Sequence, residues 1–217
     1  MRTTRVTVAA LVAAAALTLT ACDGGDHAKT DGVTQITGQS KAGAATVLDR
    51  PFDKPELVLT DTGGKPWNLR EQTQGKPTLI YFGYTNCPDV CPLTMSNIAV
   101  ARKALPKADQ ENLRVVFVTT DPERDTPESL GAWLKAQDPS FIGLTGDFAT
   151  IQAAARTLGI GIDPAKKEAD GSVVSMHGAQ VIAFSPKSNE GYLLYGENTT
   201  VDTYTKDLPK IIKGENP

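Results

Sequence analysis

The chain has 217 residues, of which 40% are apolar, and a formal net charge of −3. This length gives room for one well-buried domain with appendages and is short for two full domains. Lys and Arg are not clustered into a basic patch, so we expect no nucleic-acid partner. The mild acidic excess is spread along the chain, as is typical of a solvated surface.

The first 21 residues have the pattern of an export signal. Arg2 and Arg5 precede an apolar run over 6–19, which matches a signal peptide and is shorter than the roughly 20 residues of a membrane span. The run ends in Leu-Thr-Ala-Cys22, which resembles the lipobox at which bacterial lipoproteins are cleaved and lipidated. We therefore expect residues 1–21 to be removed and Cys22 to anchor the protein to the extracytoplasmic face of the cell membrane.

Residues 22–50 are mostly small and polar and predict a flexible tether. Residues 51–217 are predicted to form one α/β domain with a mixed central sheet, flanking helices and an N-terminal hairpin, because apolar strands alternate with helices before a final strand pair. A thioredoxin-like fold fits this order. The predicted strands are 56–60, 66–69, 78–83, 113–119, 141–144, 179–185 and 192–195, and the predicted helices are 89–105, 126–137, 147–158 and 201–213.

If Cys22 carries lipid, Cys87 and Cys91 are the remaining cysteines. They follow the predicted buried strand 78–83, at the point where open α/β sheets bind ligands. On a helix, a four-residue spacing places the two Cβ atoms about 5–6 Å apart, which serves a shared metal ion and a disulfide equally. The start of a helix is expected to lower thiol pKa values. The spacing alone leaves metal binding and redox chemistry open.

His177 precedes the predicted strand 179–185 and is one of two histidines in the chain. A single histidine is more often structural than ligating. However, in a thioredoxin-like sheet a loop entering this strand faces the start of the cysteine helix. Two thiolates and one imidazole suit copper, because three ligands can hold Cu(I) and a fourth ligand completes Cu(II). We therefore expect Cys87, Cys91 and His177 to be copper ligands.

Three segments together resemble the SCO/SenC family of copper-binding proteins, which is involved in cytochrome c oxidase assembly. They are residues 83–92 (GYTNCPDVCP), residues 120–128 (TDPERDTPE), and His177 with the strand that follows it. The resemblance spans about residues 52–213 and contains the three segments in order. It implies a thioredoxin-like fold for this part of the chain.

By this resemblance Cys87, Cys91 and His177 bind Cu(I), Cu(II) or both, and Asp121 either lies near the metal or caps a turn. The implied role is that of a monomeric metallochaperone. It would take copper from an extracytoplasmic donor and assist assembly of the dinuclear copper centre in the copper domain of cytochrome c oxidase subunit II. On this interpretation the protein is a carrier and not an enzyme.

The alternative is a thiol–disulfide oxidoreductase that keeps the cysteines of the target copper site reduced. Cys87 and Cys91 would then cycle between dithiol and disulfide. General thioredoxin activity is less favoured because three residues, and not two, separate the cysteines. A peroxidase is less favoured still, because His177 and the prolines that follow each cysteine would have no role in it.

Overall fold

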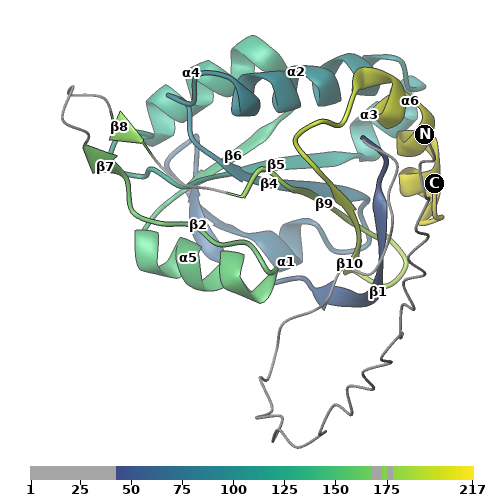
Figure 1. Ribbon diagram of the computed structural model, residues 1–217, viewed down its shortest axis with the longest axis horizontal. Helices are drawn as coiled ribbons and strands as arrows, with labels where there is room; N and C mark the ends of the chain where they lie inside the picture. The colour runs from purple at the N-terminus through teal and green to yellow at the C-terminus, as the bar shows by residue number, and fades with distance from the viewer. Residues whose placement is uncertain (1–42, 168–172, 175–177) are drawn as a thin grey trace, which may run out of the picture. The chain divides into compact units, whose positions relative to one another are not determined.

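The computed structural model describes residues 43–167, 173–174 and 178–217 (Figure 1). The predicted signal peptide, Cys22, most of the predicted tether and His177 lie outside these residues. Among the described helices, none is both long and apolar enough to cross a membrane. The strands are β1 (Thr46–Asp53), β2 (Val58–Asp61), β3 (Pro66–Asn68), β4 (Thr78–Gly83), β5 (Arg114–Thr119), β6 (Ile142–Thr145), β7 (Lys166–Lys167), β8 (Val173–Val174), β9 (Val181–Phe184) and β10 (Glu190–Tyr195), and the helices are α1 (Leu69–Gln72), α2 (Val90–Lys103), α3 (Lys107–Asn112), α4 (Pro127–Gln137), α5 (Phe148–Thr157) and α6 (Val201–Lys213).

Eight strands form one mixed sheet in the order β1-β10-β9-β4-β5-β6-β2-β3. β4, β5 and β6 run parallel, and β9 lies antiparallel to β4 on its other side. β2 and β3 form the predicted hairpin at one edge, while β7 and β8 form a separate short ribbon. The mixed sheet with flanking helices confirms the predicted thioredoxin-like α/β fold.

Helices cover both faces of the sheet (Figure 1). Leu79 and Tyr81 of the central strand β4 belong to a core that also contains buried residues of α2, α4 and α6. Ile80 and Phe82, between them in sequence, belong to a second core with buried residues of α5. Because successive strand residues point to opposite faces, a strand buried on both sides reads as a continuous apolar run. Cys87, just before α2, and Cys91, on α2, belong to the first core.

The folded domain begins earlier than the sequence indicates. β1 begins at Thr46 and pairs with β10, so the boundary predicted at Pro51 falls inside this strand. β1 is an edge strand in which Leu48 is buried while most other side chains are exposed. A strand with so few buried positions lacks the apolar alternation by which strands are found in a sequence. The pairing is also irregular between Val47 and Phe52.

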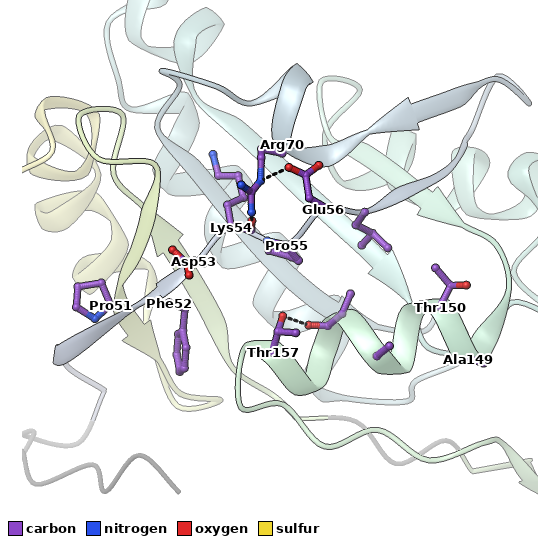
Figure 2. Close-up of a pocket in the computed structure, with 13 residues that line it drawn as sticks. Pro51, Phe52, Asp53, Lys54, Pro55, Glu56, Arg70, Ala149, Thr150 and Thr157 are labelled. Carbon is purple, nitrogen blue, oxygen red and sulfur yellow. Dashed lines mark hydrogen bonds and ion pairs between the residues drawn. The ribbon is translucent and has the colours of Figure 1, made fainter. Parts of the chain in front are cut away.

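A buried lysine fixes the connection between β1 and β2 against the sheet. Lys54 is 2% exposed, and its Nζ donates a 3.1 Å hydrogen bond to the carbonyl of Thr73 and lies 5.4 Å from the ring centre of Phe184. Arg70 donates to the carbonyl of Lys54 and pairs with Glu56 at 2.8 Å (Figure 2). Burial, and then the Arg70 charge, lower the pKa of Lys54 to about 8.

This lowered pKa predicts a pH-dependent contribution to stability. Lys54 binds its proton less tightly in the folded chain, so the folded state gains stability as pH rises from about 8 towards the ordinary lysine value of 10.5. Lys54→Met keeps an apolar stem and removes the titration. Between pH 7 and pH 9 we expect the unfolding free energy of the wild type to rise by about 1 kcal/mol relative to that of Lys54→Met, as measured by urea denaturation. A pH-independent difference would show that Lys54 titrates normally.

Candidate metal centre

Cys87 and Cys91 lie where the central strand β4 passes into α2. α2 begins at Val90, so Cys91 is its second residue and Cys87 lies in the preceding loop. The backbone N–H of Cys91 donates a hydrogen bond to the Cys87 sulfur over 3.4 Å. The loop therefore brings the Cys87 sulfur to the start of α2, and Cys87 lies before the helix, in agreement with the helix predicted over 89–105.

Both cysteines are present as thiols and both are buried, Cys91 at 0% exposure and Cys87 at 9%. The hydrogen bond between the Cys91 thiol and the Cys87 sulfur, and then burial, raise the pKa of Cys91 well above its ordinary value. The lowering expected from the helix start is therefore wrong for Cys91, because its neighbour and its buried position outweigh the helix end. A metal ion that binds this sulfur must displace a tightly held proton.

The sulfur of Cys91 packs directly on β4. The hydroxyl of Tyr81 donates to it over 3.4 Å, and the backbone N–H of Tyr84 also reaches it. A methyl group at Gly83 would lie 2.8 Å from this sulfur and 2.7 Å from Cε1 of Tyr81, closer than atoms in a packed interior approach. Glycine at position 83 is thus required by the close approach of Cys91 to the strand.

A buried carboxylate that the sequence analysis missed holds the loop before Cys87. Asp125 is fully buried and accepts hydrogen bonds from the Thr85 backbone N–H at 3.0 Å, the Thr85 hydroxyl at 2.5 Å and the Thr119 hydroxyl at 2.6 Å. Thr119 ends β5, which runs parallel to β4, so the exits of both strands meet at one sheet edge. The sequence could have pointed to Asp125 through this arrangement, because an acidic residue that follows β5 can reach the loop that follows β4.

Asp121, the residue that the sequence analysis singled out in this segment, lies in the same turn. Its carboxylate is buried and pairs with the guanidinium of Arg124, and its backbone carbonyl accepts from the N–H groups of Arg124 and Asp125. Arg124 also lies over the ring of Tyr84, 6.0 Å from its centre. Two roles were expected for Asp121, lying near the metal and capping a turn. The described contacts are those of a residue that holds a turn.

His177 lies outside the described residues, but the strand that follows it is well defined. Val181, the first residue of β9, pairs with Tyr81, and β9 runs antiparallel to β4. Residues 178–180 therefore enter the sheet at the edge where β4 leaves it, beside the cysteine loop. Within residues 43–167, 173–174 and 178–217, no three His, Cys, Asp or Glu side chains are grouped to hold a metal ion.

A sizeable pocket lies away from the cysteines. It has a volume of about 910 Å³ and lies between the segment from Pro51 to Leu57 and helix α5 (Figure 2). The buried residues of α5 pack in the core on the face of the sheet opposite to that of Cys87 and Cys91. The chemistry of the two thiols therefore belongs to the edge of the sheet beside α2 and not to this pocket.

The Asp125 contacts predict a variant that loosens the cysteine loop. Asp125→Ala leaves the Thr85 N–H and two hydroxyls without their acceptor, which is expected to cost about 3 kcal/mol of unfolding free energy. Asp125→Asn should cost less and still lower the affinity for Cu(I), because its amide presents donors where an acceptor is needed. Urea denaturation and competitive Cu(I) titration measure the two effects.

Asp147→Asn is the matched control for this experiment. Asp147 caps α5 through the backbone and hydroxyl of Thr150, away from the cysteines. Its variant should leave the Cu(I) affinity unchanged. If both variants lost the same Cu(I) affinity, Asp125 would contribute only to the stability of the fold and would have no specific effect on the cysteine loop.

Comparisons with known proteins agree with this fold and site. The SCO1/SenC family profile matches residues 46–213. The Arabidopsis thaliana mitochondrial protein SCO1 homolog 1 is 33% identical over 73% of this chain, which spans about half (46%) of that relative. Copper-bound ScoI of Bradyrhizobium japonicum shares 31% identity with a TM-score of 0.62, covering 75% of this chain and 98% of that chain. Apo Sco1 of Thermus thermophilus shares 32% identity with a TM-score of 0.67, covering 79% and 98%. Because the family match covers most of the sequence, this chain belongs to the SCO1/SenC family.

Proposed function

We propose that this protein is a copper metallochaperone and that Cys87, Cys91 and His177 bind the copper it carries. The observation that carries the proposal is the pairing of two buried cysteines at the carboxyl end of the central strand, where the Cys91 backbone N–H and the Cys91 thiol both hydrogen-bond to the Cys87 sulfur. The copper would come from an extracytoplasmic donor. Its destination would be the dinuclear copper centre of cytochrome c oxidase subunit II, which the protein approaches as a monomer held to the membrane through lipid on Cys22.

The donor set fits copper. Thiolate sulfur is a soft ligand that favours Cu(I), and two adjacent thiolates can hold Cu(I) with an imidazole as third ligand. Cu(II) depends more strongly on the nitrogen ligand, so His177 is expected to matter most for Cu(II). Membership of the SCO1/SenC family and the copper-bound structure of the Bradyrhizobium japonicum relative support this assignment.

The same contact favours a second candidate function, reduction of a partner's disulfide. In that reaction a thiolate of Cys87 attacks the partner, and Cys91 then displaces the partner's cysteine. Cys87 and Cys91 give up two electrons and two protons and become joined, while the partner's disulfide becomes two thiols. Cys87 is the attacking residue on this scheme, because it retains 9% exposure whereas Cys91 has none.

Substitution of the three ligands should separate their contributions. For the reduced full chain, His177→Ala is expected to weaken Cu(II) binding at least as much as the roughly 10–100-fold that follows loss of an outer-shell partner. Cu(I) binding should change much less, while Cys87→Ser and Cys91→Ser should abolish tight Cu(I) binding. Competitive titrations with chelators of known affinity measure each value, and unchanged Cu(II) affinity and absorption in His177→Ala would refute the three-ligand site.

Mixing the loaded protein with an apo copper domain of subunit II separates the two functions. Transfer of copper to the reduced domain identifies a metallochaperone. Reduction of the disulfide form of the same domain by the metal-free dithiol, with only weak copper binding, identifies a reductase. The Cys91→Ser variant is the control for the reductase, since it can form a mixed disulfide with the partner but cannot resolve it.

The proposed anchor is testable separately. The wild-type chain should be found in the membrane fraction and incorporate a labelled fatty acid. Cys22→Ser should lose the label and leave the membrane fraction while retaining its copper binding. Equal labelling of both proteins would place the lipid elsewhere.

A further inference from the structure

The hydroxyl of Tyr81 lies against the sulfur of the more deeply buried cysteine. Tyr81 projects from β4 into the core beneath α2, and its hydroxyl is 3.4 Å from the sulfur of Cys91. Its ring packs against Phe117 of β5 at a centroid distance of 5.8 Å, which fixes its direction. Gly83 leaves the space in which this hydroxyl and this sulfur meet.

A second hydroxyl supports the first. Thr94 is also buried, lies three residues after Cys91 on α2, and hydrogen-bonds through its side chain to Tyr81. The Tyr81 oxygen can therefore accept from Thr94 while it donates to Cys91. Hydrogen bonds arranged in such a chain strengthen one another in a buried environment.

Metal binding makes this donor more important. A thiolate that binds a metal has lost its proton and can only accept hydrogen bonds, and a buried charged group is costly without them. Donors that reach the Cys91 sulfur include the Tyr81 hydroxyl and the Tyr84 backbone N–H. Hydrogen bonds to a metal-bound sulfur withdraw electron density from it, which favours the reduced form of the metal.

We propose that Tyr81, supported by Thr94, is a positioning residue that orients the Cys91 thiolate and sets the balance between Cu(I) and Cu(II). This inference rests on the proposed copper site at Cys87 and Cys91. The Tyr81 hydroxyl donates to the metal-bound sulfur and weakens its bond to Cu(II) more than its bond to Cu(I). The site thereby favours Cu(I) beyond what its ligands alone would give.

The test uses Tyr81→Phe, which keeps the ring and its packing on Phe117 and removes only the hydroxyl. In the purified full chain we expect the ratio of Cu(II) to Cu(I) affinity to rise about tenfold, within the range for outer-shell partners. A tenfold change corresponds to a reduction potential lower by about 59 mV for one electron. The sulfur-to-Cu(II) absorption band should move to longer wavelength, because the sulfur becomes richer in electrons. Thr94→Val should shift the ratio of Cu(II) to Cu(I) affinity and the absorption band in the same directions, but by smaller amounts.

Tyr195→Phe is the matched control. Tyr195 is a buried tyrosine of the same core, and its hydroxyl donates to Asp207 at 3.1 Å instead of to a sulfur. Its variant should change stability without moving the absorption band or the affinity ratio. Urea denaturation confirms that each variant is folded.

The outcomes separate the two proposals. If Tyr81→Phe lowers Cu(I) and Cu(II) affinity by the same factor and leaves the band in place, Tyr81 only packs and the inference is overturned, while the copper site stands. If the wild-type chain binds neither Cu(I) nor Cu(II), both the proposed function and the inference are refuted. A raised ratio with a shifted band in Tyr81→Phe, absent in Tyr195→Phe, supports the role of the hydroxyl.

Discussion

The close packing of the Cys91 sulfur on β4 is the constraint on which the candidate site depends. The sulfur lies above Gly83, where any larger residue would collide with it, and beside the Tyr81 hydroxyl. β4 is the central strand and is buried on both faces. The core that stabilises the domain therefore also fixes the position of Cys91. Copper, on the proposed function, would bind to a sulfur whose place is set before the metal arrives.

Cys87 is held by different means, because it lies in a loop and not on the helix. The loop is tied to the exit of β5 through the buried carboxylate of Asp125, which accepts from the backbone and side chain of Thr85. The adjoining turn is closed by the ion pair of Asp121 with Arg124. Loops at the exits of two parallel strands thus cooperate to place one thiol. This arrangement gives one rigid sulfur and one whose position depends on a polar network.

The sequence predicted the elements whose burial follows a regular pattern and missed those whose role depends on neighbours. β4 was predicted with the bounds that it has, 78–83, because a strand covered on both faces is a continuous apolar run. α6 was likewise predicted over 201–213. Edge strand β1 was missed because few of its side chains are buried. Cys87 and Cys91 could be identified from composition and spacing alone, but Tyr81 reads as an ordinary strand residue. The contact of its hydroxyl with Cys91, and the raised pKa of that thiol, arise only when α2 packs on β4.

The contact between the two sulfurs also links the two candidate functions physically. Binding of copper by both thiolates requires loss of two protons, and formation of a disulfide requires loss of two protons and two electrons. Both events consume the same sulfurs, so an oxidised pair cannot bind copper through thiolates. Outside the cytoplasm thiols tend to become oxidised, and a copper carrier there depends on a reductant that restores the dithiol. Because Cys91 has no exposed surface whereas Cys87 retains 9% exposure, copper and reductant would, on the proposed functions, both reach Cys87 first. On the two proposed functions, loading with metal and cycling of electrons would therefore be alternative states of one site, and the supply of reductant would decide between them.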